Sequence, residues 1–272
     1  MTIKDILVLL DSTSEAVGPY AVSMASSFDA NLTAAAVVVD PTTSIALVDT
    51  PTSFLTAALE EARAAARQIL TSFERGARQS GVAIDTEPVE TAVGTTGQAL
   101  GPLARHFDVT IVEQPDPDVP TEREMMIEAA LFGSGRPVLI VPYIQKPPFR
   151  LESALVAWDG SATAARALAD AMPFLEKSKR IEIVTVADDG EDADATGSRL
   201  QRHLARHGFE TEFRRITGAD EAAGALLSHA FDAGADLMVM GGYGHSRFRE
   251  LILGGATRGV LSTMTLPVLM SH

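Results

Sequence analysis

Apolar positions along the chain fall into short unbroken runs, separated by longer stretches that carry apolar residues at helical spacing. Residues 7–10 (LVLL), 34–39 (AAAVVV) and 138–141 (VLIV) are apolar at consecutive positions instead of alternating positions. This pattern is typical of parallel strands that are covered by helices on both faces. Strands of this kind alternating with helical stretches predict an α/β fold with a doubly wound, Rossmann-like sheet.

Each half of the chain is predicted to contain five strands and four helices in alternation. The strands of the first half are Ile6–Leu10, Leu32–Val39, Ala83–Ala92, Val109–Glu113 and Val138–Val141. Its helices are Ser14–Phe28, a long helix within Thr52–Gly81, Thr96–Phe107 and Glu122–Phe132. The strands of the second half are Ala154–Trp158, Ile181–Ala187, Glu210–Ile216, Leu237–Met240 and Val268–Met270. Its helices are Ala162–Leu175, Thr196–Gly208, Ala219–Ala233 and Arg258–Thr263.

The two halves repeat one another in sequence. Residues 5–16 (DILVLLDSTSEA) align with residues 153–164 (SALVAWDGSATA), and each segment ends a strand with an aspartate, Asp11 or Asp159. Later blocks follow in the same order, FDVTIVEQ with ADLMVMGG and RPVLIVPY with LPVLMSH. A fixed order of repeated blocks indicates two copies of one structural unit. We therefore predict a first module at 1–143, a linker at 144–151 and a second module at 152–272.

The extra length of the first module lies in its long second helix, which is rich in strong helix formers. Its segment Ala57–Ile69 is amphipathic, with Leu59, Ala66 and Ile69 on one face. Packing on the sheet is the ordinary role of such a helix, and a surface that faces a partner or a lipid is the alternative.

Composition narrows the classes of function. The chain has 272 residues, a formal net charge of −14 and no cysteine, which excludes disulfides, cysteine-ligated zinc, iron–sulfur clusters and thiol nucleophiles. The negative charge disfavours nucleic acid and anionic membranes as partners. No apolar run approaches the roughly 18–20 residues of a membrane helix, and the N-terminus lacks a secretory signal, so a cytoplasmic protein is expected.

The charge is unevenly divided between the halves. Residues 1–149 carry a net charge of −10, whereas residues 150–272 carry −4. An anion is therefore expected in the second half. That half contains the glycine-rich segment GGYGHSRFRELILGGATRG, which follows the predicted strand Leu237–Met240. Glycines let backbone N–H groups approach a phosphate, and a helix that opens near Gly254 and Gly255 would present its N-terminus to it.

Other motifs are absent or weak. The chain has no Walker A sequence, no HExxH and no spacing that argues for a Ser/His/Asp triad, so no catalytic residue and no metal ligand is predicted. His245 and Ser246 are expected to face solvent, while Arg247 and Arg249 are left open as phosphate contacts. The acidic stretch Asp188–Asp194 is expected to be a solvated loop, with a magnesium site as the less favoured alternative.

A doubly wound half-chain with Asp159 closing its first strand resembles the universal stress protein family. The glycine spacing after the fourth strand, Gly241-x2-Gly244-x9-Gly254, and the segment Pro267-Val268-Leu269 resemble the same family. The resemblance covers nearly the whole chain as a tandem of two modules. It implies two mainly parallel five-stranded sheets, paired through their fifth strands as an intramolecular pseudo-dimer. Further association into a homodimer of pseudo-dimers stays open.

The resemblance also implies that the second module binds ATP or a related adenine nucleotide, with or without Mg²⁺. The implied nucleotide-binding residues are Ala157, Asp159, Val186, Met240, Gly241, Tyr243, Gly244, Gly254, Gly255, Ala256 and Thr257. The chain departs from the family at Gly255, where the family has serine or threonine. Gly255 offers a backbone N–H but no hydroxyl, which weakens the case for a triphosphate more than for a monophosphate.

The first module departs further from the family pattern. Glu113 stands where the second module has Gly241, and Asp116, Asp118, Glu122 and Glu124 follow it. Missing glycines and charge repulsion predict a degenerate first module that binds no nucleotide.

Three functional hypotheses follow. The leading one is a non-catalytic or weakly catalytic nucleotide-binding stress-response module, whose nucleotide state alters the surface that it presents to an unidentified protein partner. The second is an interaction scaffold without nucleotide, and the third is slow ATP hydrolysis. The leading hypothesis predicts that bulky side chains at Gly244 and Gly254 abolish binding.

Overall fold

The computed structural model describes residues 2–43, 51–115, 122–146, 148–187, 193–219, 221–243 and 255–272. The chain forms two compact units, Thr2–Phe149 and Arg150–His272, which are described separately below. The boundary at 149/150 falls within the segment 144–151 that was predicted to be the linker.

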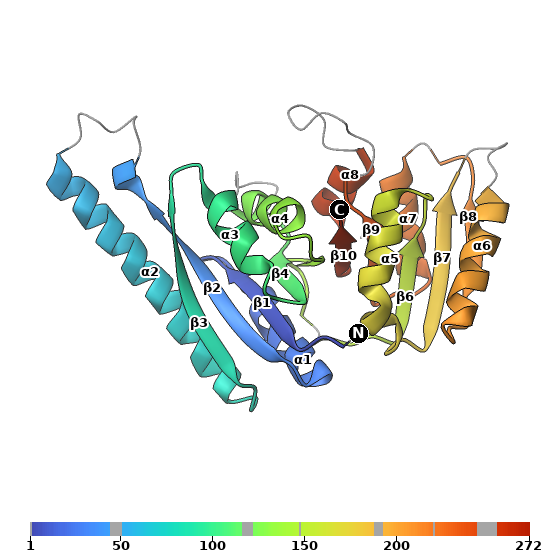
Figure 1. Ribbon diagram of the computed structural model, residues 1–272, viewed down its shortest axis with the longest axis horizontal. Coiled ribbons are helices and arrows are strands. Elements are labelled where there is room, and N and C mark those ends of the chain that lie inside the picture. Colours follow the sequence, from blue (N-terminus) through green and yellow to red (C-terminus); the bar gives the residue numbers. More distant parts are fainter. Residues whose placement is uncertain are drawn as a thin grey trace. The chain divides into compact units, whose positions relative to one another are not determined.

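The first unit is a five-stranded parallel sheet with helices on both faces (Figure 1). Its strands are β1 (Asp5–Leu10), β2 (Asn31–Asp40), β3 (Ile84–Ala92), β4 (Val109–Glu113) and β5 (Val138–Val141). Its helices are α1 (Val17–Phe28), the 3₁₀ turn η1 (Pro41–Thr43), α2 (Thr52–Arg78), α3 (Thr96–Ala104) and α4 (Glu122–Gly133).

The second unit repeats this arrangement. Its strands are β6 (Ser153–Ala157), β7 (Arg180–Val186), β8 (Glu212–Ile216), β9 (Leu237–Gly241) and β10 (Val268–Ser271). Its helices are α5 (Ala162–Leu175), α6 (Ala193–Arg206), α7 (Ala222–Asp232) and α8 (Gly255–Thr263). Both sheets have the same strand order, β3-β2-β1-β4-β5 in the first and β8-β7-β6-β9-β10 in the second.

The α/β doubly wound fold predicted from the apolar runs is confirmed. In the first unit α1 and α2 pack together on one face of the sheet, while α3 and α4 pack together on the other. In the second unit α5 and α6 contact the sheet, and α7 packs with α8. The central strands β1 and β4 are buried over nearly all of their residues, as expected for strands that helices cover on both faces, and β5 is buried throughout. The edge strand β3 is largely exposed and contains Pro88, a residue that sheets tolerate at an edge.

Element ends differ from the predictions by a few residues. Three helices near the carboxyl ends of the strands begin three residues from their predicted starts: α1 at Val17, α7 at Ala222 and α8 at Gly255. Asp11 Oδ1 accepts hydrogen bonds from the Thr13 N–H at 2.8 Å and from the Ser14 hydroxyl at 3.0 Å. This side-chain turn holds residues 12–14 in a loop and delays the start of α1.

The strand order places a reversal between β1 and β4 in the first unit and between β6 and β9 in the second. In doubly wound sheets, ligands bind at the carboxyl ends of the strands beside such a reversal.

The predicted pairing of the fifth strands as a pseudo-dimer concerns the placement of the two units and stays a prediction. Among the described residues no helix is long and apolar enough to cross a membrane.

Candidate functional site

A pocket of about 290 Å³ lies at the carboxyl ends of β6, β7 and β9, beside the first turns of α7 and α8. This is the reversal point of the second sheet. Twelve residues line it: Ala157, Trp158, Asp159, Val184, Val186, Ala222, Leu226, Met240, Gly241, Gly255, Ala256 and Thr257.

Eight of the eleven predicted site residues line this pocket. They are Ala157, Asp159, Val186, Met240, Gly241, Gly255, Ala256 and Thr257. Tyr243 is described but does not line the pocket: it is buried, and its backbone has a positive φ of 57°. The predicted residues Gly244 and Gly254 lie outside the described part of the chain, as do His245, Ser246, Arg247 and Arg249.

The turn after β6 sets Asp159 at the pocket mouth. The Trp158 N–H donates to the Val184 carbonyl at 2.8 Å, and the Thr185 hydroxyl donates to the Trp158 carbonyl at 2.8 Å, so β6 and β7 stay paired to their ends. Gly160 then reverses the chain with a positive φ of 76°. Ser161 caps α5 by accepting a hydrogen bond from the Ala164 N–H at 3.1 Å, while its own N–H donates to Asp159 Oδ1 at 2.9 Å. The Asp159 side chain remains exposed.

Gly241 closes the floor of the pocket against α5. A Cβ atom at this position would lie 2.6 Å from the Ala164 backbone nitrogen and 2.6 Å from Thr163 Oγ1. No side chain fits there without moving backbone. The glycine at the end of β9 is therefore required by the packing of the strand on the first turn of α5, in addition to any approach of a ligand.

The first turn of α8 supplies backbone donors at the pocket. The helix spans Gly255–Thr263, three residues longer at its start than the predicted Arg258–Thr263, so Gly255, Ala256 and Thr257 form its first turn. The first N–H groups of a helix have no partner within it and attract anions. Gly255 and Ala256 are exposed, whereas Thr257 is buried and its Oγ1 accepts a hydrogen bond from the Tyr243 N–H at 3.1 Å. Thr257 thus ties Tyr243, near the start of the glycine-rich segment, to the first turn of α8.

Four lining residues were not predicted from the sequence: Trp158, Val184, Ala222 and Leu226. Trp158 is half-buried in the pocket wall. Its indole N–H is buried and has no hydrogen-bond partner in the described structure. Ala222 and Leu226 are four residues apart on α7, so they share a helix face, but their pattern alone does not separate a pocket wall from ordinary packing.

In the first module, the side chain of Arg123 lies at the carboxyl ends of β1 and β4, the strands that correspond to β6 and β9 of the second module. Arg123, in the first turn of α4, donates through Nε to Asp11 Oδ2 at 2.5 Å and through Nη2 to Asp11 Oδ1 at 3.0 Å. Its Nη2 also donates to Thr13 Oγ1 at 2.7 Å, and its Nη1 lies 3.0 Å from Glu113 Oε1. The Arg123 side chain is 6% exposed and those of Asp11 and Glu113 are 12% and 3% exposed. Arg123 therefore forms a buried ion-pair network with both carboxylates.

The Glu113 carboxylate also binds the N-terminus of α1, where a free anion would otherwise be attracted. Its Oε2 accepts hydrogen bonds from the Ala16 and Val17 N–H groups, each at 2.9 Å, so the carboxylate caps α1. Burial raises the pKa of Glu113 above its ordinary 4.5, opposed by the Val17 N–H and by the charge of Arg123. Burial also raises the pKa of Asp11, but the hydrogen bonds and charge of Arg123, together with Thr13, outweigh it and lower that pKa from 3.8 to about 2.

The sequence predicted that acidic residues crowd the end of β4, but it did not predict that Arg123 pairs with two of the carboxylates there. Asp116 and Asp118 lie outside the described residues, and the side chain of Glu122 is not described. The negative side chains that do meet there, Asp11 and Glu113, are matched by one guanidinium.

No metal site is found among the described residues, since no three His, Asp or Glu side chains cluster there. Of the acidic stretch after β7, residues 188–192 lie outside the described part. Asp194 is described, and its Oδ2 lies 3.4 Å from Arg215 Nη1 in an exposed ion pair.

Comparison with known proteins identifies relatives of both the second module and the whole chain. Residues 151–272 match the universal stress protein family. Universal stress protein Slr1230 of Synechocystis sp. is 28% identical over 214 residues, which cover 75% of this chain and 71% of that protein.

Solved structures share the tandem fold. A universal stress protein from Archaeoglobus fulgidus is 17% identical, covers 99% of this chain and 96% of its own, and superposes with a TM-score of 0.73. At that identity the likeness establishes the fold. A universal stress protein solved in complex with cAMP is 23% identical over 46% of this chain and 98% of its own, with a TM-score of 0.39.

Proposed function

We propose that this chain, which belongs to the universal stress protein family, binds an adenine nucleotide in its second module only and acts as a regulatory stress-response protein. The observation that carries the proposal is the pocket of about 290 Å³ at the reversal point of the second sheet. Eight of the eleven residues that the family resemblance implies as nucleotide ligands line this one cavity.

The residues present fit the chemical parts of a nucleotide. Val184, Val186 and Leu226 form an apolar wall suited to the faces of a purine ring. The exposed carboxylate of Asp159 can accept hydrogen bonds from sugar hydroxyls. The exposed N–H groups of Gly255 and Ala256 at the start of α8 suit phosphate oxygens.

The size of the pocket favours a small nucleotide. Small-molecule pockets usually enclose about 300–1,000 Å³, and the volume here, about 290 Å³, lies at the lower end. Together with the missing hydroxyl at position 255, this argues for a monophosphate or a cyclic monophosphate before a triphosphate.

The first module is not expected to bind nucleotide. Arg123 fills the position beside Asp11, and Glu113 already occupies the N-terminus of α1. A phosphate would have to displace a buried carboxylate from both partners, which leaves that charge unpaired.

Trp158 makes a direct test available, because it is the only tryptophan of the chain and lines the pocket. We expect AMP, ADP, ATP and cAMP to change its fluorescence, with a stoichiometry of one nucleotide per chain. Dissociation constants in the micromolar to millimolar range are expected.

Two substitutions of Ala256, one charged and one neutral, test the position of the phosphate. Ala256→Glu places a carboxylate in the first turn of α8, where it suits the helix but repels phosphate, so at least tenfold weaker binding is expected. Ala256→Gln has nearly the same shape without the charge and should bind within about threefold of the wild type. Equal binding in both variants, or two nucleotides per chain, would overturn the site assignment.

The nucleotide-free scaffold remains the second candidate, and the departure at Gly255 favours it. No fluorescence change and no thermal stabilisation with any of the four nucleotides would select it. Slow hydrolysis is not proposed: Asp159 is the one ionisable residue among those that line the described pocket, and its Oδ1 already accepts from Ser161.

A further inference from the structure

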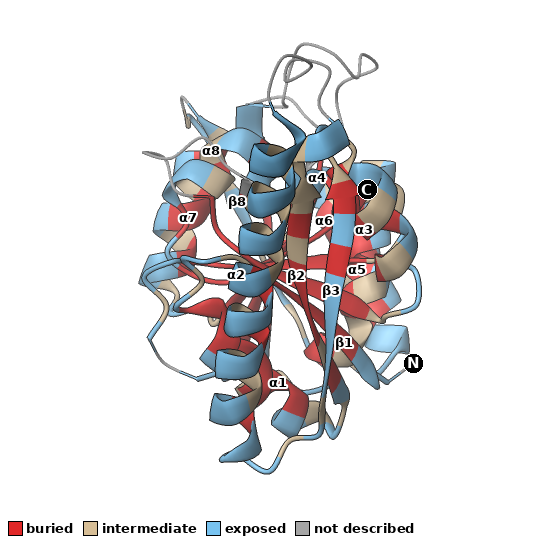
Figure 2. Ribbon diagram, turned by 90° about the vertical axis from the view of Figure 1, so that its left-hand side faces the viewer, coloured by how far each residue is buried: buried red, intermediate tan, exposed pale blue. Residues whose placement is uncertain are grey.

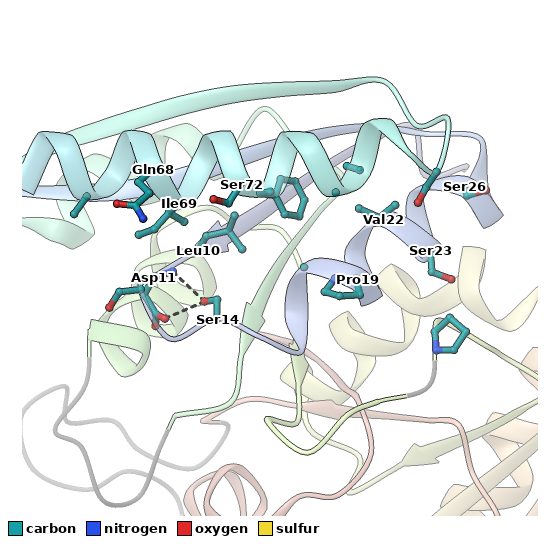
Figure 3. A pocket seen from close by; sticks show the side chains of 18 residues that line it. Leu10, Asp11, Ser14, Pro19, Val22, Ser23, Ser26, Gln68, Ile69 and Ser72 are labelled. Carbon is teal, nitrogen blue, oxygen red and sulfur yellow. Dashed lines mark hydrogen bonds between the residues drawn. The ribbon is translucent and has the colours of Figure 1, made fainter.

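A cavity of the first module lies between α1 and α2 and ends at Asp11, the carboxylate that Arg123 binds. Its volume is about 900 Å³, compared with about 290 Å³ for the pocket of the second module. Figure 3 shows the side chains of both helices facing this cavity, with Asp11 and Ser14 at one end.

Small residues of α2 leave room for the cavity, since Ala65, Ser72, Gly76 and Ala77 are among its lining residues. Of the 27 residues of α2 only Ala66, Leu70 and Ala77 are buried, and Figure 2 shows the helix exposed along most of its length. The two helices approach closely at Gly18, where a Cβ would lie 3.3 Å from the Phe73 ring. At Gly76, which also lines the cavity, a Cβ would meet no atom within 4 Å.

The lining is apolar at its floor and hydroxylic around it. Leu10 and Val22 are 3% and 7% exposed and form the floor with Ile69. Ser23 and Ser26 on α1, Ser72 on α2 and Ser80 in the turn after α2 also line the cavity. These four hydroxyls make no hydrogen bond to another described residue, so they are free to bind a ligand.

The cavity offers a ligand no free charge. Among its described lining residues the one ionisable group is Asp11, whose carboxylate is bound to Arg123 and Thr13. An anionic ligand would find no cation, and a cationic ligand would find a carboxylate that is already paired. The lining runs along α2 from Ala65 to Ala77, which at a rise of 1.5 Å per residue is about 18 Å.

We propose that this groove is a second binding site, for one uncharged amphiphile with an extended apolar chain and a hydroxyl-bearing head group. The apolar chain would lie on Leu10, Val22 and Ile69, and the serine hydroxyls would bind the head group. The site is separate from the nucleotide pocket and does not depend on the proposed nucleotide binding.

Titration calorimetry with the intact protein tests the ligand class. The probe is monolauroylglycerol below its critical micelle concentration, compared with laurate and dodecyltrimethylammonium, which carry similar chains and opposite charges. We expect saturable binding of one monolauroylglycerol per chain and at least fivefold weaker binding of both charged probes. Absence of saturable binding, or equal binding of all three probes, overturns the proposal.

Blocking variants test the location. Gly76→Leu places a side chain in the open part of the groove and should weaken binding at least tenfold. Gly224→Leu, at an exposed position of α7 where a Cβ also meets no atom within 4 Å, is the matched control and should bind as the wild type does. Ser23→Leu fills the opposite wall and decides the matter if Gly76→Leu fails to fold, as judged by circular dichroism. Wild-type affinity in a folded blocking variant overturns the proposal.

Discussion

The two modules share a strand order and a helix arrangement, yet the carboxyl ends of their sheets differ in chemistry. In the second module β9 ends in Gly241, and an open pocket follows. In the first module β4 ends in Glu113, which caps α1 and pairs with Arg123, and Arg123 binds Asp11. The difference teaches that the fold provides the location of a site, whereas the residue at one strand end decides whether a ligand or a side chain occupies it.

The comparison also separates two ways of satisfying a helix N-terminus. α1 uses the carboxylate of Glu113 from a neighbouring strand, while α5 uses the hydroxyl of its own Ser161. The first solution ties α1, β4 and α4 into one buried charged network. The second leaves the space above β9 open.

The strongest test of this difference is removal of Arg123. Arg123→Ala leaves Asp11 and Glu113 buried without their partner, so the free energy of unfolding should fall by about 3–5 kcal/mol. Urea unfolding followed by circular dichroism measures the loss, while Trp158 fluorescence follows the second module separately. Arg78→Ala is the control, since Arg78 forms an exposed ion pair with Glu74, and its effect should stay below about 1 kcal/mol. Equal effects of the two variants would contradict the network.

A methyl group at Gly241 tests the packing in the second module. Gly241→Ala forces a Cβ against the Ala164 backbone, and about 3 kcal/mol of destabilisation is expected. Gly224→Ala adds the same methyl where no atom lies within 4 Å, so stabilisation of up to about 1 kcal/mol is expected from its better helix propensity. Thermal unfolding monitored at Trp158 distinguishes the two, and a neutral Gly241→Ala would show that α5 and β9 are not in tight contact.

Acid titration probes the sealed network in a third way. The pKa of Asp11 is lowered from 3.8 to about 2, so its contribution is complete above 3.8 and is lost as the pH falls through 2; at 1.36 kcal/mol per pH unit this is about 2 kcal/mol. The raised pKa of Glu113 acts in the opposite sense: stability increases as the pH falls towards 4.5 and is constant below it. The free energy of unfolding should therefore pass through a maximum near pH 4.

The variant Asp11→Asn isolates the acidic limb of that profile. It should flatten the loss of stability between pH 4 and pH 2, whatever its effect at neutral pH. A variant that retains the wild-type slope in this range would show that another group causes the acid dependence.

The smallest expected effect sharpens the comparison within the second module. Gly255→Ser adds a hydroxyl at the start of α8, where a Cβ meets no atom within 4 Å. A new hydrogen bond to a phosphate should strengthen ATP binding about three- to tenfold and AMP binding less. Gly255→Ala is the control for the added Cβ. Equal gains for ATP and AMP would place the hydroxyl away from the terminal phosphate.

The sequence patterns predicted the order of elements well because parallel buried strands need consecutive apolar residues, as in β1 and β5. They also placed Asp159 after the first strand of the second module, where it lines the pocket, but they placed the start of α8 three residues too late, at Arg258. Element ends such as Val17 were missed because a side-chain turn and a distant carboxylate determine them.

The parts of the sites that were missed depend on contacts between distant segments. Ala222 and Leu226 reach the pocket from α7, and their spacing is the same as that of any packed helix face. Arg123 lies 112 residues from Asp11, and counting the acidic residues around it gave no indication that it would pair with Asp11 and Glu113. The cavity between α1 and α2 arises from small residues whose effect appears only when the two helices lie together.

The buried ion-pair network of the first module also affects how occupancy of the chain depends on ligand concentration. A chain that carried two equal, open sites could couple them and respond steeply over a narrow range of ligand concentration. With Arg123 in one of the two positions, the proposed function predicts that nucleotide occupancy of a single chain follows a simple hyperbola. On that proposal the response to nucleotide is graded, and one affinity alone sets its midpoint.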